Sequence, residues 1–212
     1  MKFENYNEDQ YDLLRELTNI AIGQTTAELG HLWNTRVEFS IPQVNMVTFN
    51  DMRGRLLELY ASFSGVSVVK QVFEGLLEGE ILLIFGEDGM SAVAKLKGQN
   101  DPLTLKEEQS LLRETTATIT RSSLNGLIES FDGEISLRKL SIFCERKPFM
   151  NFLNDLFPRG KQENTQWKYS LLINVIFTAS DDNFDCFILI LLSEASVEKL
   201  RCELEQLIEE EY

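Results

Sequence analysis

Histidine, cysteine and long apolar runs are scarce in this sequence. There is one histidine, His31, and the three cysteines (Cys144, Cys186 and Cys202) form no paired spacing. This inventory argues against a structural zinc site, and we expect no metal site in the chain. An odd number of scattered cysteines is typical of reduced thiols in a cytoplasmic protein. Because His31 has no nucleophile motif beside it, the sequence also does not predict a Ser-His-Asp hydrolase.

The distribution of apolar residues also predicts no membrane-spanning or secretory segment. The longest apolar run, residues 187–192, falls far short of the roughly 20 residues that a membrane-spanning helix needs. The first ten residues are polar and acidic, without the apolar region of a signal peptide. We therefore expect no membrane span and a cytoplasmic location.

Positive charge is the third deficit. Twenty Lys and Arg residues stand against 34 Asp and Glu residues, giving a net charge of −14. Such an acidic surface repels nucleic acids and anionic lipids, so neither is an expected partner. No Gly-rich loop with a lysine follows a strand, which argues against binding of a free phosphorylated metabolite. If the chemistry involves phosphate, the partner must supply the cation and the metal.

An internal duplication is the main positive signal. Residues 12–23, DLLRELTNIAIG, return as residues 110–121, SLLRETTATITR. Each copy follows a capping-box pattern, Asn7 with Gln10 and Thr104 with Glu107, which marks the start of a helix. Repeats of about 7–98 and 104–210 predict one α+β domain over residues 1–212. The two pseudo-symmetric helix-strand repeats would share a mainly antiparallel sheet flanked by helices.

The remaining elements follow the same order in both halves. Residues 36–49 read as extended chain, in which Pro42 indicates a sheet edge or a bulge. Residues 132–143 read as one strand in the second half, and residues 158–166 as a mobile loop. Apolar alternation and turn residues predict hairpins from residues 67–75 with 80–86 and from 168–179 with 184–193. The helices expected after the long first helix of each half cover residues 50–59, 87–98, 147–157 and 194–212.

A polar stripe runs along the first helix, opposite its leucine-rich face. Residues three and four apart share one side of a helix, and those on this side are Asp12, Glu16, Asn19, Gly23 and Thr26. A solvated helix face would explain any one of them. Glycine, however, costs about 1 kcal/mol relative to alanine in a helix interior, and the second copy carries Ala117 and Arg121 where the first has Asn19 and Gly23. We interpret the stripe as functional.

The chemistry of these side chains suggests a task. Glu16 can pair with a lysine or arginine of a partner. One turn later, Asn19 offers an acceptor and a donor on a short side chain, which can hold a water and a phosphoryl oxygen together. Gly23 leaves space for another surface to approach.

The spacing Asp12-x3-Glu16-x2-Asn19-x22-Pro42 resembles the signature of the CheC/CheX/FliY family of bacterial chemotaxis phosphatases, and the two-half layout resembles its CheC-type members. The resemblance implies dephosphorylation of the phospho-aspartate of a CheY-like response regulator. It implies that Glu16 engages a regulator lysine and Asn19 orients the attacking water, with Asp12, Gly23 and Pro42 supporting the partner contact. It also implies no cofactor in this chain, because Mg²⁺ would belong to the regulator, and a CheD-like deamidase as a possible second partner.

The second helix departs from that pattern. Ser110 and Glu114 keep the spacing, but Ala117 cannot hold a water and Leu140 replaces the proline. We expect this degenerate second site to be catalytically silent, with Glu114 an ordinary surface carboxylate. The alternative function is a non-catalytic adaptor that binds an activated response regulator or a CheD-like deamidase.

Overall fold

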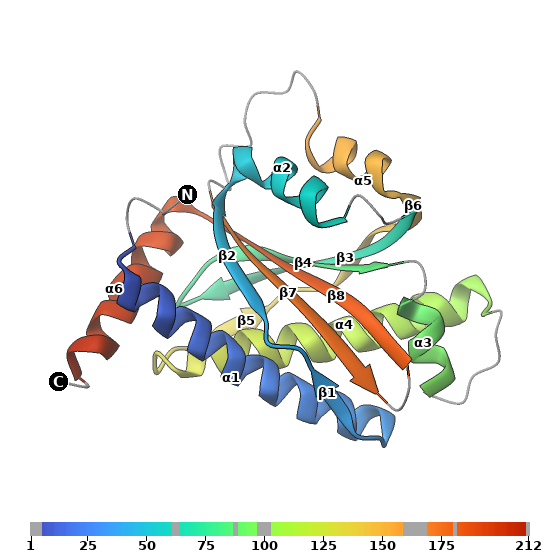
Figure 1. Cartoon of the computed structure of the whole chain (residues 1–212), viewed down its shortest axis with the longest axis horizontal. Helices are drawn as coiled ribbons and strands as arrows, with labels where there is room; N and C mark the ends of the chain where they lie inside the picture. Colours follow the sequence, from blue (N-terminus) through green and yellow to red (C-terminus); the bar gives the residue numbers. More distant parts are fainter. Residues whose placement is uncertain are drawn as a thin grey trace.

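The computed structural model describes residues 6–60, 64–86, 89–96, 103–158, 169–179 and 182–210. Its elements occur in one order that is used twice: helix, two strands, helix, two strands, helix (Figure 1). The first half comprises α1 (Glu8–Trp33), β1 (Val37–Phe39), β2 (Gln43–Thr48), α2 (Phe49–Tyr60), β3 (Gly65–Gly75), β4 (Gly79–Gly86) and α3 (Gly89–Leu96). The second half comprises α4 (Leu105–Glu129), β5 (Ile135–Leu137), β6 (Ser141–Pro148), α5 (Phe149–Leu156), β7 (Tyr169–Ala179), β8 (Asp182–Leu192) and α6 (Glu194–Glu210).

All the described strands join one antiparallel sheet, in the order β1-β7-β8-β4-β3-β5, with β2 also on β7 and β6 also on β3. The order is symmetric about the central β4–β8 pair. Each half supplies the outer strands of the other, since β1 and β2 pair with β7 while β5 and β6 pair with β3. The predicted α+β fold, a single domain built around a mainly antiparallel sheet, is confirmed.

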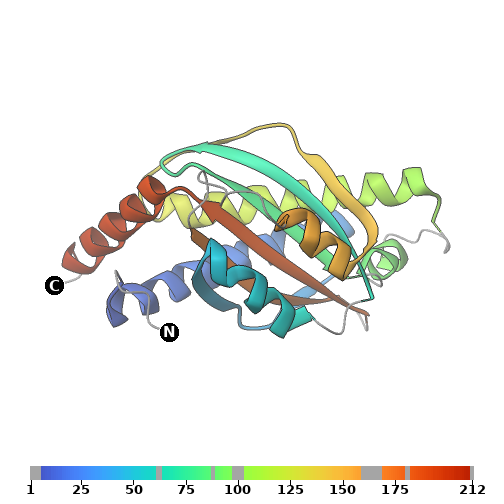
Figure 2. The same cartoon turned by 90° about the horizontal axis from the view of Figure 1, so that it is seen from above.

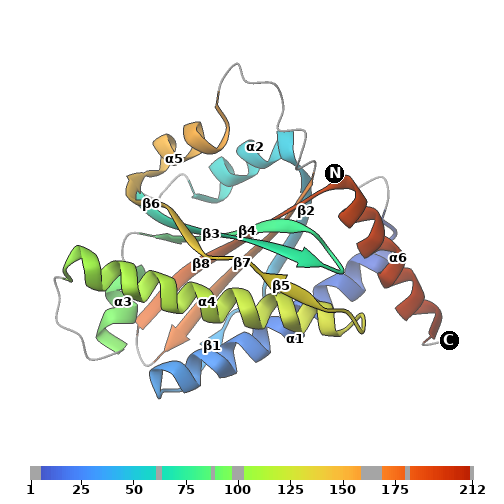
Figure 3. The same ribbon diagram turned by 180° about the vertical axis from the view of Figure 1, so that it is seen from behind.

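Both faces of the sheet are covered by helices. In Figures 1 and 3, α1 and α4 cross one face while α2 and α5 lie over the other, and Figure 2 shows α2 and α5 from above. Side chains of β4 alternate between two cores: Ile81, Leu83 and Phe85 pack toward α1 and α4, whereas Leu82 and Ile84 pack toward α2 and α5. Burial on both faces explains why the strand is a continuous apolar run rather than an alternating one.

The start of each long helix is capped as the sequence predicts. The Asn7 side chain accepts from the backbone N–H of Gln10, and the Gln10 side chain accepts from that of Asn7. Thr104 and Glu107 make the same reciprocal pair at α4. These bonds satisfy N–H groups that a helix start leaves without partners, so they fix where both helices begin.

Two expectations about local structure were wrong. Residues 132–143 are not one strand, because β5 ends at Leu137 and β6 starts at Ser141, both paired with β3. Thr26 does not belong to the exposed stripe: it is buried, and its hydroxyl donates to the carbonyl of Ile22 at 2.7 Å. The hydroxyl is satisfied within the helix, which lets this threonine face the core.

Other expectations concern the edge strands, a loop and membrane spans. Pro42 lies between β1 and β2, which pair only with β7, so its predicted place at the sheet edge is confirmed. Most of the loop expected at residues 158–166 lies outside the described residues. Within the described part of the chain, no helix combines the length and apolarity needed to span a bilayer.

Candidate functional site

The stripe on α1 is open to solvent where the sequence places its chemistry. Asp12, Glu16 and Asn19 are exposed, whereas Leu14 and Leu17, on the other side of the helix, are buried in the core. Leu14 is fully buried, so the helix cannot rotate without exposing it. The core therefore fixes the direction in which the three polar side chains point.

Glu16 and Asn19 are without a partner in the described part of the chain. Among the described residues, neither the Glu16 carboxylate nor the Asn19 carboxamide makes a hydrogen bond or an ion pair. They are separated by about 4.5 Å along the helix axis, since each residue adds about 1.5 Å. A carboxylate and an amide, both free and held on a rigid helix, can contact two neighbouring groups of another molecule at once.

Asp12 is engaged differently. Its carboxylate pairs with Arg15 at 2.9 Å, three residues along the same helix, and both side chains are well exposed. An exposed pair of this kind contributes little to stability, and a competing partner can displace it at low cost. Asp12 is therefore available at the N-terminal end of the stripe.

Gly23 is not required by the packing of the fold. A methyl group built at Gly23 would meet only the Phe39 ring, at 3.9 Å and 4.0 Å, which is ordinary van der Waals distance. Gly126 on α4 is different, because a methyl group there would clash with Gln24 and lie 3.0 Å from the Cα of Ala21. Gly126 is needed where the two long helices cross, whereas Gly23 is half-buried against Phe39 and the fold leaves room there for a methyl group.

Pro42 is buried beside this helix rather than presented to solvent. Its neighbour Ser40 binds β7 through both backbone and side chain, donating its N–H to Ile176 O at 2.9 Å and accepting from Ile176 N at 3.0 Å. Pro42 can therefore affect the site only by shaping the chain between β1 and β2, and not through direct contact with a partner.

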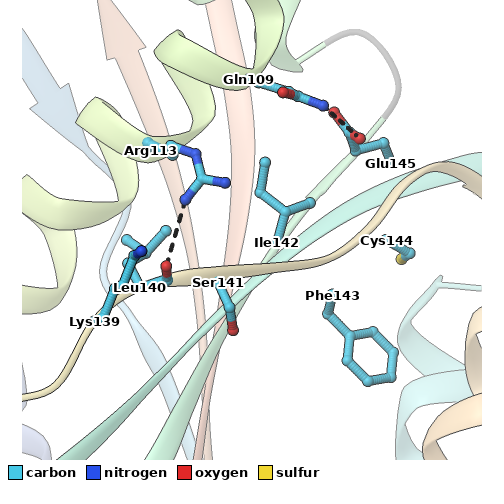
Figure 4. A pocket seen from close by; sticks show the side chains of 9 residues that line it. All are labelled: Gln109, Arg113, Lys139, Leu140, Ser141, Ile142, Phe143, Cys144 and Glu145. Carbon is cyan, nitrogen blue, oxygen red and sulfur yellow. Dashed lines mark hydrogen bonds between the residues drawn. The ribbon is translucent and has the colours of Figure 1, made fainter.

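The corresponding surface of α4 has a different structure. Ser110 is exposed, Glu114 and Ala117 are half-buried, and Arg121 is exposed where α1 has Gly23. With Ser110 in place of an aspartate, Arg113 has no carboxylate one turn away, and it donates instead to the carbonyl of Leu140 at 3.4 Å (Figure 4). The arginine thus spans from α4 to the residue before β6; the corresponding residues of the first half are Arg15 and Pro42.

Sequence reasoning did not predict two cavities that flank these helices. One, of about 460 Å³, lies between α4 and β6 and is lined by Gln109, Arg113 and residues 139–145 (Figure 4). The other, of about 850 Å³, lies between the start of α1, β2 and α2, and Asp12 and Arg15 lie on its wall. Neither contains Asn19. Glu16 also lines neither cavity, so these two side chains are suited to contact with a macromolecule rather than to enclosure of a small substrate.

An ion pair between a buried carboxylate and an exposed arginine was missed as well. Glu108 on α4 is 3% exposed and receives two bonds from Arg146 on β6, at 3.0 Å and 2.6 Å. Arg146 has a positive φ of 43° where the β3–β6 register shifts, and its N–H also donates to Ser67 Oγ. The pair links the start of α4 to an irregular strand. In the sequence, only the position of Glu108 one turn before Leu111 and Leu112, on the buried face of the helix, could have indicated it.

The fold is shared with FliY, the FliM middle domain and the chemotaxis protein CheX. FliY of Thermotoga maritima superposes with a TM-score of 0.68 at 19% identity, over 95% of this chain and 98% of that one. The FliM middle domain of H. pylori gives 0.58 at 12% identity, over 93% and 99%. CheX of Desulfovibrio desulfuricans gives 0.50 at 14% identity, over 82% and 99%. No protein-family model and no curated protein matches the sequence.

These structural neighbours agree with the resemblance read from the motif. At such low identities the likeness establishes the fold alone, and the roles of Glu16, Asn19 and the second helix stay predictions. Among the described residues, no three His, Cys, Asp or Glu side chains gather as a metal site would require.

Proposed function

We propose that this protein acts in chemotaxis-type signalling and dephosphorylates the phospho-aspartate of a CheY-like response regulator. The observation that carries the proposal is the pair of exposed, unpartnered side chains Glu16 and Asn19, one turn apart on a helix whose next turn is bare at Gly23. A core-fixed helix that presents free polar groups, followed by a turn without a side chain at Gly23, is suited to contact with the surface of another protein.

The proposed reaction is hydrolysis of an acyl phosphate. The Asn19 carbonyl accepts a hydrogen bond from a water while its NH₂ group donates to a phosphoryl oxygen, which aligns the water for in-line attack on phosphorus. The bond from phosphorus to the aspartyl oxygen breaks, the regulator regains a carboxylate, and inorganic phosphate leaves with the proton. Phosphoryl transfer needs positioning and charge stabilisation more than a strong base, so an amide suffices.

The regulator supplies what the acidic chain does not. Its Mg²⁺ neutralises charge on the phosphoryl group, and its lysine would pair with Glu16. The single helix with an intact amide would perform the chemistry, while the α4 surface with Ala117 and the Arg113 bridge is silent. A cytoplasmic location follows from this proposal, because response regulators act there.

A phosphorylation-decay assay tests the proposal. CheY-like regulators of the source organism are phosphorylated with acetyl phosphate, and loss of the phosphoryl group is followed with wild type, Glu16→Ala and Asn19→Ala. We expect Asn19→Ala to lower turnover by roughly two to four decades while docking persists, because removal of one well-placed catalytic group usually lowers the rate by that factor. Asn154→Ala, an exposed asparagine on α5, serves as the matched control and should keep full activity.

The alternative is a non-catalytic adaptor that binds an activated regulator or a CheD-like deamidase. Two structural neighbours support this alternative. FliM of H. pylori has been solved as a FliG–FliM complex and as a FliM–SpeE complex, so proteins of this fold bind other proteins. An adaptor would bind the phosphorylated regulator without accelerating its decay, even as wild type. A normal rate with Asn19→Ala would likewise reject the catalytic proposal.

A further inference from the structure

Two isoleucines are strongly exposed beside the candidate site. Ile41 is 86% exposed and Ile20 is 47% exposed. Ile20 directly follows Asn19 on α1, and Ile41 directly precedes the buried Pro42. A single exposed isoleucine needs no explanation, but two at one site, beside free polar groups, form an apolar surface next to the proposed chemistry.

The packing of α1 against the edge strands places Ile41 level with Asn19 and Ile20. Phe39 at the end of β1 lies against Gly23, and residues 44–48 of β2 share a cavity wall with Asp12 and Arg15. The chain between them therefore runs antiparallel to α1, past the turn that begins at Glu16. A strand advances about 3.3 Å per residue and a helix about 1.5 Å, so two residues beyond Phe39 correspond to about four residues before Gly23.

The fold does not require apolar residues at these places. Equivalent residues of the two repeats lie 98 positions apart, as Asn19 and Ala117 do. Thr118 is therefore the equivalent of Ile20, and Lys139 is the equivalent of Ile41. Thr118 is half-buried and its hydroxyl donates to the carbonyl of Glu114; Lys139 is exposed. The scaffold thus accepts a polar and a charged residue on the half that has lost the amide.

We propose that Ile20 and Ile41 are the apolar contact that seats the phosphorylated regulator over Asn19. The inference rests on the proposed function, and it commits to one occupant: the face of the regulator that surrounds its phospho-aspartate. Because Asn19 must reach the phosphoryl group, the partner necessarily covers the helix surface within one turn of it. The side chains in that area are Glu16, Ile20 and Ile41, which lies at the same height along the helix.

The arrangement defines the chemistry of the partner surface. The regulator presents a cation opposite Glu16, and it presents apolar side chains, beside its acyl phosphate, opposite the two isoleucines. Burial of apolar surface contributes to affinity independently of salt, whereas the Glu16 pair weakens as salt rises. The isoleucines therefore determine which regulators dock, and the amide determines what happens to those that do.

The test transfers the residues of the second half onto the first. Ile20→Thr, Ile41→Lys and the double variant are assayed with the acetyl-phosphate-labelled regulator that wild type dephosphorylates fastest. Their binding is also titrated with the same regulator carrying beryllium trifluoride in place of the phosphoryl group. We expect Ile41→Lys to raise KM and Kd about tenfold and the double variant more, with kcat nearly unchanged. Asn19→Ala should show the opposite split, a lost kcat with Kd kept.

Met150→Thr is the matched control. Met150 is 49% exposed on α5, on the opposite face of the sheet, so its replacement should change neither constant. Unchanged KM and Kd in the isoleucine variants, with normal wild-type turnover, would overturn this inference and leave the phosphatase proposal intact. Binding that the isoleucine variants weaken, without any wild-type turnover, would reject the phosphatase and keep the docking surface. Wild type that neither binds nor dephosphorylates any regulator would reject both.

Discussion

Gly23 offers a prediction in which stability and activity change in opposite directions. Gly23→Ala should stabilise the fold, because the added methyl group meets only the Phe39 ring at 3.9 Å and 4.0 Å. Removing a glycine from a helix interior contributes about 0.5–1 kcal/mol. For a chain of 212 residues, a change of this size raises Tm by roughly 1–4 °C.

Activity should fall in the same variant. If the gap at Gly23 receives the regulator, a methyl group displaces the partner from Asn19, and misplacement by about 1 Å can cost on the order of a hundredfold in rate. We expect kcat/KM to fall at least tenfold for Gly23→Ala. Gly23→Arg, which copies Arg121 of α4, should abolish turnover.

Gly126→Ala is the matched comparison. Its methyl group would lie 3.0 Å from the Cα of Ala21, where α1 and α4 cross, so overpacking of about 1–3 kcal/mol should exceed the helix-propensity gain. Thermal unfolding followed by circular dichroism measures both variants. A lower Tm for Gly23→Ala would show that the glycine serves the fold; a higher Tm with full activity would show that no partner enters the gap.

Three further predictions concern stability and reactivity. Arg146→Ala leaves the carboxylate of Glu108, which is 3% exposed, without its bidentate partner. Urea titrations should show the free energy of unfolding lowered by about 2 kcal/mol. Breaking a fully buried pair would cost more, but this arginine is itself largely exposed. An unchanged urea midpoint would refute the coupling of α4 to β6. Thr104→Ala removes the N-cap of α4 and should cost about 1 kcal/mol, a loss that Thr104→Ser should largely avoid. Burial raises the pKa of Cys144 to about 11, so this thiol stays protonated, and unreactive, up to about pH 10. Iodoacetamide at pH 8 should therefore modify the exposed Cys202 first, as peptide mass mapping would show, and faster labelling of Cys144 would contradict its burial.

The sequence predicts those parts of the fold whose signals are local. Capping boxes place the starts of α1 and α4, and turn residues with apolar runs place both hairpins. The exchange of edge strands between the halves could not be predicted, because the pairing partners, from 60 residues apart (Gly75 and Ile135) to 142 (Val37 and Ala179), leave no local pattern. The break between β5 and β6 was missed for a similar reason: pairing with β3, and not strand propensity, decides where each segment begins.

The site was predictable to the extent that helical spacing determines it. The period of 3.6 residues places Asp12, Glu16 and Asn19 on one exposed face, but it placed Thr26 there as well. The Thr26 hydroxyl donates a hydrogen bond to the preceding turn of the helix and needs no water, which residue spacing alone does not indicate. The approach of Ile41 to the helix depends on how α1 packs against the edge strands, so it becomes apparent only in three dimensions.

The exchange of edge strands also affects when Asn19 acquires its position during synthesis. α1 is made first, yet it packs on a sheet whose β7 and β8 are made nearly last, and the Tyr6 hydroxyl donates to the carbonyl of Val197 at 2.9 Å. Contacts this distant in sequence form late. An incomplete chain on the ribosome would therefore carry Asn19 on an unanchored helix, so the proposed activity would require the completed chain.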